Sequence, residues 1–234
     1  LAKDTINTVE ATKTIQSETG EKACKRYIIS QCQSALNAIE VYGLFLLGGW
    51  SAEDVNIDIV PLFETIADLK EAADVMHQLY ENPLYRQHLA RRNDTQTIML
   101  GFSDGTKDGG YLMANWSIYK AKDELTELSR SYGVNVIFFE GRGGPPARGG
   151  GKTHKFFSSM GKNIANDAIQ VTIQGQTVSS NFGTINAAQF NLEQLLNAGI
   201  FNHLFSAKDE TFDSSEESLM QSIADASFAE YESL

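Results

Sequence analysis

The chain has 234 residues, of which 42% are hydrophobic and 21% are charged, and its formal net charge is −11. This composition is that of a globular protein with one large core or two small ones, and no apolar run is long enough to span a membrane. The acidic balance argues against nucleic acid as a partner, although a local cluster of arginines can still attract a small anion.

The amino terminus and the cysteines bear on where the protein works. Residues 1–6 are polar and helix-like, so we expect no signal peptide, and the missing initial Met hints at a segment of a longer protein. Cys24 and Cys32 have no metal-ligand spacing. We interpret them as free thiols, which predicts a reducing, cytoplasmic location.

Helical patterns alternate with short apolar runs in the first half of the chain. A helix is expected at residues 10–21, a strand at 27–30, a helix at 33–47 and a strand at 56–60 that stops at Pro61. Thr65 and Asp68 have the spacing of a capping box at the start of the next helix, which runs to residue 80. Asn82 and Pro83 break that helix and start another, through residue 91.

The alternation continues to the end of the chain. Strands are expected at residues 97–100, 134–139 and 168–173, and helices at 111–131, 186–204 and 215–234. This order predicts parallel βα units, hence an α/β fold in one fragment, residues 1–234, with a helical tail at 186–234. A doubly wound sheet and a β/α barrel both remain open, and about five strands make up only part of an eight-stranded barrel.

A glycine-rich stretch follows the strand at 134–139 directly. It reads Gly141-Arg-Gly-Gly-Pro-Pro-Ala-Arg-Gly-Gly-Gly151 and contains Arg142 and Arg148. Glycine lets backbone N–H groups approach a ligand closely, and arginine presents a planar fork of donors to phosphate or carboxylate. A flexible linker would instead carry Ser, Gln or Lys. We therefore expect an anion-binding site at the carboxyl end of this strand.

Two carboxylates follow two other strands. Glu64 comes after the strand at 56–60, and Asp104 after the strand at 97–100. Such hard oxygen ligands suit Mg²⁺ or Mn²⁺, which takes one or two protein carboxylates together with substrate oxygens and water. The alternatives are a helix-starting acid for Glu64 and a structural turn for Asp104. Lys107 either balances charge near the metal, meets a substrate anion or is simply solvated.

Four stretches together match the pattern of one enzyme family. They are Tyr27-Ile-Ile-Ser30, Pro61-Leu-Phe-Glu-Thr65, Gly101-Phe-Ser-Asp-Gly-Thr-Lys-Asp-Gly-Gly110 and the Gly141–Gly151 stretch, in that order. In these motifs, and in the helices that flank them, the chain resembles an internal segment of phosphoenolpyruvate carboxylase.

This resemblance implies a reaction and a role for each motif residue. The family converts phosphoenolpyruvate and bicarbonate to oxaloacetate and phosphate with Mg²⁺ or Mn²⁺, as a cytoplasmic homotetramer built on a β/α barrel and inhibited by acidic metabolites such as aspartate or malate. By motif position, Glu64 and Asp104 take the metal-ligand roles, and Lys107 takes a supporting catalytic role. Arg142 takes the phosphate-binding role, and Arg148 the role of the arginine near bicarbonate, which aspartate also recruits as inhibitor.

The chain departs from the family pattern beside the glycine–arginine stretch. The family usually has His where this chain has Glu140. An ionised Glu cannot donate a hydrogen bond to bicarbonate, so we expect it to be protonated, to pair with an arginine, or to be replaced as donor by another residue. His154 is the nearest candidate, although it could equally be a plain helix-start histidine. Pro145 and Pro146 also differ from the family and stiffen the stretch.

Several catalytic parts of the family have no counterpart in this sequence. These are its amino-terminal catalytic histidine, an upstream phosphate-binding arginine and a mobile downstream loop. We therefore expect the chain to be inactive alone, with exposed apolar surface that favours oligomers or low solubility. The alternative is a non-catalytic remnant that binds an acidic metabolite through Arg148.

Overall fold

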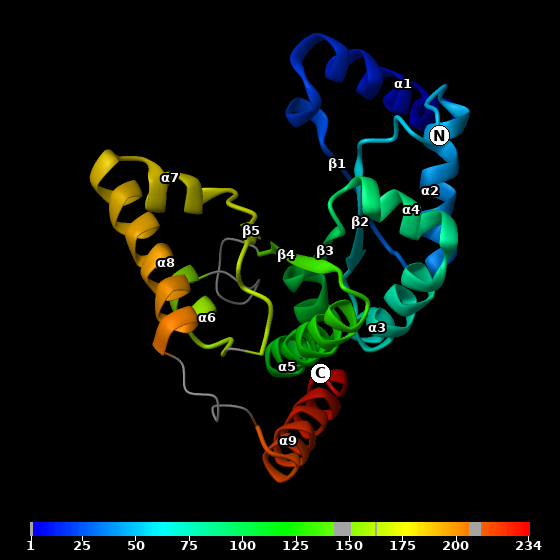
Figure 1. The fold of residues 1–234 in the computed structure, drawn as a ribbon. Coiled ribbons are helices and arrows are strands. Elements are labelled where there is room, and N and C mark those ends of the chain that lie inside the picture. Colours follow the sequence, from blue (N-terminus) through cyan, green and yellow to red (C-terminus); the bar gives the residue numbers. More distant parts are fainter. Residues whose placement is uncertain (1, 143–150, 162, 206–211) are drawn as a thin grey trace.

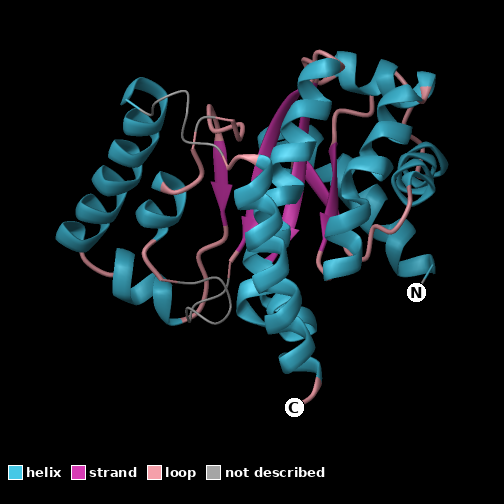
Figure 2. Ribbon diagram, turned by 90° about the horizontal axis from the view of Figure 1, so that it is seen from below, coloured by secondary structure: helices cyan, strands magenta, loops and turns pink. Residues whose placement is uncertain are grey.

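The computed structural model describes residues 2–142, 151–161, 163–205 and 212–234 (Figure 1). These residues form helices and parallel strands in alternation for most of the chain (Figure 2). In chain order the elements are α1 (Ala2–Thr19), the 3-10 helix η1 (Glu21–Cys24), β1 (Arg26–Ile29), α2 (Ala35–Leu47), β2 (Asp58–Phe63), α3 (Ile66–Glu81), α4 (Pro83–Arg91), β3 (Thr95–Gly101), α5 (Phe102–Ser131), β4 (Asn135–Gly141), α6 (Thr153–Ser158), β5 (Ile169–Val171), α7 (Gln176–Phe182), α8 (Ile185–Phe205) and α9 (Ser214–Glu232).

The sheet is parallel throughout, and each strand pairs with its neighbour in sequence, in the order β1-β2-β3-β4-β5. Consecutive strands of a β/α barrel pair in this way, whereas a doubly wound sheet reverses its strand order at a switch point. The predicted α/β class and the five parallel strands are confirmed. Because all strands run in one direction, their carboxyl ends lie along one edge of the sheet.

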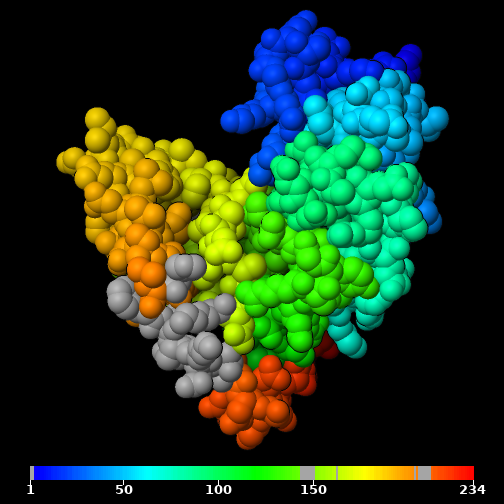
Figure 3. Space-filling model, viewed as in Figure 1, coloured from blue at the N-terminus to red at the C-terminus, as the bar shows by residue number. Residues whose placement is uncertain are grey.

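Most of the described helices form three groups around this sheet. Helices α2 to α5 contact strands β2 to β4. Helix α9 packs on α5, and helices α6 and α7 both pack on α8 beyond β5 (Figure 1). The space-filling view shows a notch between the α7 segment and the amino-terminal segment around α1 (Figure 3). None of the described helices is long and apolar enough to cross a membrane.

The main core lies between the sheet and helices α2 to α5. Phe45, Phe63, Tyr80, Leu100 and Phe138 are all at most 1% exposed. Outside this core, α8 carries large apolar side chains that are exposed. The expectation of exposed apolar surface is thus confirmed, while oligomerisation remains a prediction.

The helix-start signals of the sequence are confirmed. Thr65 accepts from the backbone N–H of Asp68, whose own carboxylate accepts from the N–H of Thr65 at 3.1 Å, completing the capping box of α3. Asn82 caps α4, with Pro83 as its first residue. Local hydrogen bonding therefore fixes where the chain leaves β2 and enters α3, immediately after Glu64.

Two expectations about the chain path were wrong. Strand β2 does not stop at Pro61 but continues to Phe63. Pro61 pairs with Ile29, the last residue of β1. The proline therefore stands at the end of the β1–β2 ladder, where its missing N–H donor costs little. The stretch 101–110 is not a loop either, since residues 102–109 are helical and Gly110, at φ 74°, marks a kink before the expected long helix.

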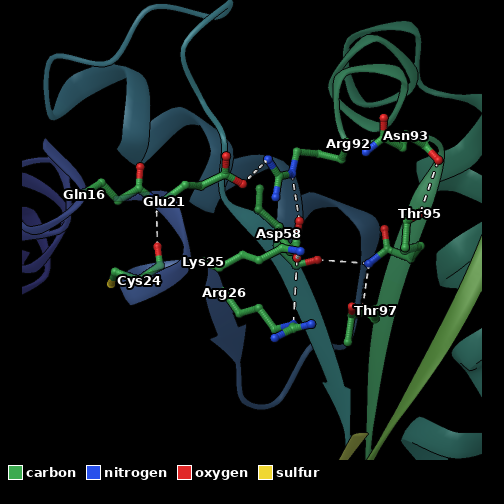
Figure 4. A network of polar contacts seen from close by, with 12 residues as sticks. Gln16, Glu21, Cys24, Lys25, Arg26, Asp58, Arg92, Asn93, Thr95 and Thr97 are labelled. Carbon is green, nitrogen blue, oxygen red and sulfur yellow. Dashed lines mark hydrogen bonds and ion pairs between the residues drawn. The ribbon is translucent and has the colours of Figure 1, made fainter. Parts of the chain in front are cut away.

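A polar network joins the opposite, amino-terminal ends of the first three strands (Figure 4). Asp58 Oδ1 accepts from Arg92 Nε at 2.8 Å, and its Oδ2 lies 3.7 Å from Lys25 Nζ and 3.8 Å from Arg26 Nε. Arg92 also pairs with Glu21 at 2.8 Å. Lys25, Arg26 and Arg92 surround the half-buried Asp58 carboxylate. These contacts connect the start of β1 and the segment before β3 to the start of β2.

Candidate active site

Glu64 and Asp104, predicted to be metal ligands, lie side by side. Glu64 is the first residue after β2, and Asp104 lies in the first turn of α5, directly after β3. Their carboxyl groups are within hydrogen-bonding contact, and the pKa of Glu64 is raised, first by burial and then by the carboxylates of Asp104 and Asp68. A backbone hydrogen bond from Gln31, just after β1, opposes this shift. The carboxyl ends of three strands therefore meet at Glu64.

Glycines make this close approach possible. A Cβ atom at Gly101 would lie 3.2 Å from Glu64 Cα and Cγ, and one at Gly105 would lie 3.2 Å from the Glu64 carbonyl oxygen. Contacts this short require a neighbour to move. The glycines of the 101–110 motif therefore let the start of α5 pack directly on the residue that follows β2.

Two further residues of the same motif fix the geometry around the carboxylates. Lys107 Nζ contacts Asp104 Oδ1 at 2.8 Å, with both side chains at least half exposed. This geometry supports the charge-balancing interpretation of Lys107. Asp108, which the sequence did not single out, accepts from the backbone N–H of Ile66 at 2.8 Å and so tethers the start of α3 to α5. The motif thus connects two βα units by its backbone and its side chains.

Arg142 is the second residue of the glycine–arginine stretch and lies directly after β4. It follows Gly141, which pairs with Gly101 at the ends of β4 and β3. Its side chain is 5% exposed, with Cζ 4.4 Å from the ring centroid of Phe156 and 5.8 Å from that of Phe102. Burial lowers the pKa of Arg142 and nearby Glu140 opposes that shift, but a guanidinium stays protonated in either case. Arg142 is therefore a buried cation stacked on aromatic rings.

Glu140 pairs with a lysine of the preceding helix. It is fully buried, and its Oε1 accepts a hydrogen bond from Lys122 Nζ on α5. Lys122 is 1% exposed; burial lowers its pKa, whereas the charge and hydrogen bond of Glu140 raise it. Pairing with an arginine was one of the three options for Glu140, but the observed ion pair is with Lys122, a residue that the sequence analysis had missed.

A signal for Lys122 was available in the helical pattern. It lies four residues after Ile118 and three before Leu125, on the stripe of α5 that faces the core. A lysine on an apolar stripe is buried only when it is paired. The next strand carries Glu140, in alternation with the buried Val136 and Phe138, which identifies the partner.

The remaining predicted site residues divide between described and undescribed parts of the chain. His154 is the second residue of α6 and is half-buried, as a helix-start histidine would be. Phe156 of the same helix packs against the Arg142 guanidinium, so α6 lies next to the candidate site. Arg148, Pro145 and Pro146 lie outside the described residues, and their roles stay predictions.

The donor set of the carboxylate pair suits a hard divalent cation. Glu64 and Asp104 offer carboxylate oxygens at the carboxyl ends of β2 and β3, and Lys107 contacts Asp104. Within the described ranges no cluster of three or more His, Cys, Asp or Glu side chains could hold a metal. A pair of carboxylates fits Mg²⁺ or Mn²⁺, which completes its shell with water and substrate oxygens, and does not fit a structural zinc site.

Comparison with known proteins agrees with this geometry. The family model of phosphoenolpyruvate carboxylase matches residues 1–234. Two sequences of phosphoenolpyruvate carboxylase from Corynebacterium glutamicum are 35% and 34% identical to the chain over 221 residues. Each match covers 92% of this chain and 24% of the relative, so the chain spans about a quarter of the length of the curated relatives it matches. The chain belongs to the phosphoenolpyruvate carboxylase family.

Proposed function

We propose that this chain is the segment of a phosphoenolpyruvate carboxylase that carries the metal site and part of the anion site. The complete enzyme would join phosphoenolpyruvate to bicarbonate and release oxaloacetate and phosphate. The observation that carries the proposal is the contact between Glu64 and Asp104, which follow two successive strands, beside the strand that Arg142 follows. Carboxylates that can hold a divalent metal, beside an arginine at the carboxyl ends of parallel strands, suit metal-assisted chemistry on an anionic substrate.

Each residue has a defined task in this proposal. Glu64 and Asp104 would hold Mg²⁺ or Mn²⁺, which when bound supplies a positive charge against the developing enolate oxygen. Lys107 would keep the Asp104 carboxylate oriented and add positive charge at the rim. Arg142 would bind the phosphate of phosphoenolpyruvate, and Arg148 would bind bicarbonate or an acidic inhibitor such as aspartate or malate. Fixed cations of this kind stabilise anionic transition states without reorganising.

The surroundings of the segment are part of the same proposal. The sequential strand order and the notch between the α7 segment and the α1 segment suit an incomplete β/α barrel, which further strands would close between β5 and β1. We place the complete enzyme in the cytoplasm as a homotetramer. The isolated chain, with only part of the anion site, would be inactive.

The test of the metal site is a titration with Mn²⁺. In the complete protein, Glu64→Gln will weaken Mn²⁺ binding by at least about a hundredfold, because it removes a direct ligand and the loss of an outer-shell partner alone costs up to about that much. Glu53→Gln, an exposed position of equal charge, will leave Mn²⁺ affinity unchanged. Equal affinities in both variants would remove Glu64 from the metal site. Oxaloacetate formation by the isolated chain at the rate of the complete protein would refute its incompleteness.

The second candidate is a non-catalytic protein that binds an acidic metabolite through Arg148. It was suggested by Glu140, which stands where the family has His, but pairing with Lys122 balances the charge of Glu140. Calorimetry with aspartate and with phosphoenolpyruvate separates the two candidates. Phosphoenolpyruvate binding that depends on Mn²⁺ supports the enzyme, and metal-independent aspartate binding alone supports the remnant.

A further inference from the structure

Three charged side chains and one aromatic ring form a buried cluster at the root of the glycine–arginine stretch. Lys122 and Arg142 lie against the same ring, with Lys122 Nζ 4.9 Å and Arg142 Cζ 4.4 Å from the centroid of Phe156. Glu140 lies two residues before Arg142 and is bonded to Lys122. We call Lys122, Glu140, Arg142 and Phe156 the root cluster. Its net formal charge is +1, from two cations and one anion.

The Glu140 carboxylate of the root cluster interacts with two cations, Lys122 and Arg142. Glu140 has no exposed surface, and its Oε2 has no hydrogen-bond partner among the described residues. A buried carboxylate is strongly destabilised unless a cation and hydrogen bonds compensate it. The charges of both Lys122 and Arg142 act on Glu140, yet the short contact is made with Lys122. Without Lys122, Arg142 would remain as a cation whose charge interacts with Glu140.

We infer that Lys122 is a positioning residue for phosphate recognition. Its hydrogen bond engages the Glu140 carboxylate, so the Arg142 guanidinium stays on the ring of Phe156 instead of pairing with Glu140. This inference rests on the proposed role of Arg142 in binding the phosphate of phosphoenolpyruvate. A carboxylate that captured the guanidinium would compete directly with the substrate phosphate for the same donors. The pair therefore acts on substrate affinity through Arg142 and touches no reacting atom.

The test is a pair of substitutions in the complete protein. Lys122→Met keeps the length and apolar stem of the side chain but removes its charge. It will raise the KM for phosphoenolpyruvate by about tenfold or more, with a smaller change in kcat, the pattern of lost substrate binding. Adding Glu140→Gln in the same protein removes the competing carboxylate, so the double variant will return KM to within about threefold of the wild type, as coupled residues do.

A matched control separates position from charge. Lys120→Met removes the same charge from the same helix, two residues earlier, where Lys120 contacts Gln221 of α9 at 3.3 Å. It will leave KM unchanged. The inference is overturned if Lys122→Met lowers the melting temperature while KM stays at the wild-type value, or if the double variant keeps the raised KM.

A binding measurement keeps this inference separate from the proposed reaction. Calorimetry with inorganic phosphate reports on the Arg142 site whether or not oxaloacetate is made. A wild-type protein without carboxylase activity, but with phosphate affinity that falls in Lys122→Met and returns in the double variant, rejects the proposed reaction and retains the positioning role. Phosphate affinity that is the same in all variants rejects the positioning role alone.

Discussion

Asp58→Asn tests the network that joins the amino-terminal ends of the strands. Asn keeps the size of the side chain and an acceptor oxygen for Arg92, but it removes the negative charge that faces three cations. Lys25 and Arg26, at 3.7 and 3.8 Å from the carboxylate, would then face Arg92 with only Glu21 to balance them. The folded state should lose stability although its shape is unchanged.

The size of the effect follows from burial. The side chains of Asp58 and Arg92 are 12% and 10% exposed, so their 2.8 Å contact is screened far less than a surface ion pair. Breaking a fully buried pair costs about 3–5 kcal/mol, and the retained acceptor and the second partner of Arg92 reduce this to about 2 kcal/mol. For a chain of this length the melting temperature should fall by about 6 °C.

Thermal unfolding followed by circular dichroism measures this change. Asp54→Asn, an exposed acid four residues earlier, is the control and should melt with the wild type. Arg92→Met combined with Asp58→Asn should cost less than the sum of the single changes, because the pair is then lost only once. If Asp58→Asn and the control melt at the same temperature, the network does not stabilise the sheet.

Three other substitutions probe separate parts of the fold. Burial, with Arg91 and Arg92 nearby, lowers the pKa of His88 from 6.5 to about 4. The stability His88 contributes is therefore complete above pH 6.5 and is lost as pH falls toward 4, by up to about 3 kcal/mol. Urea unfolding near neutral and at mildly acidic pH should show that His88→Gln loses less stability on acidification than the wild type. An equal loss of stability in both proteins would refute the role of His88. Gly141→Ala would place a Cβ 2.8 Å from the Leu100 carbonyl oxygen, so it should lower the stability by about 1–3 kcal/mol and weaken phosphate binding measured by calorimetry. Unchanged stability and phosphate affinity would count against this close contact between β3 and β4. Tyr231→Phe removes the 2.8 Å hydrogen bond to the Lys107 carbonyl and should destabilise the docking of α9 by about 1 kcal/mol, seen as faster amide exchange in α9; unchanged exchange would count against that contact.

The strand pattern was predictable because each strand is a short run of apolar, mostly β-branched or aromatic residues. Residues 134–139 illustrate this, with Val136 and Phe138 on the buried side of β4. The ends of elements were less predictable. Pro61 is a strand breaker by local rules, yet the end of β1 at Ile29 makes it tolerable within β2. That outcome depends on a partner strand, which local sequence does not contain.

The site was predictable as far as residue type and strand order determine it. Glu64 and Asp104 were found because both directly follow a strand, and parallel strands bring such residues to one edge. The ion pair of Glu140 with Lys122 was missed because the two residues come from a strand and the preceding helix, and only their packing brings them together. A structural turn was one interpretation of the residues around Asp104, whereas Gly101 and Gly105 permit close packing of a helix start.

The sequential strand order also shapes how the chain folds. Among the described strands, each pairs with its neighbours in sequence and with no other. Every pairing can therefore form as soon as one more strand and helix have been added, with no need for distant parts of the chain to find each other. Loop closure over such moderate separations has a low entropic cost. During synthesis the sheet can grow one βα unit at a time from β1, and Glu64 and Asp104 would come together as soon as β3 docks on β2.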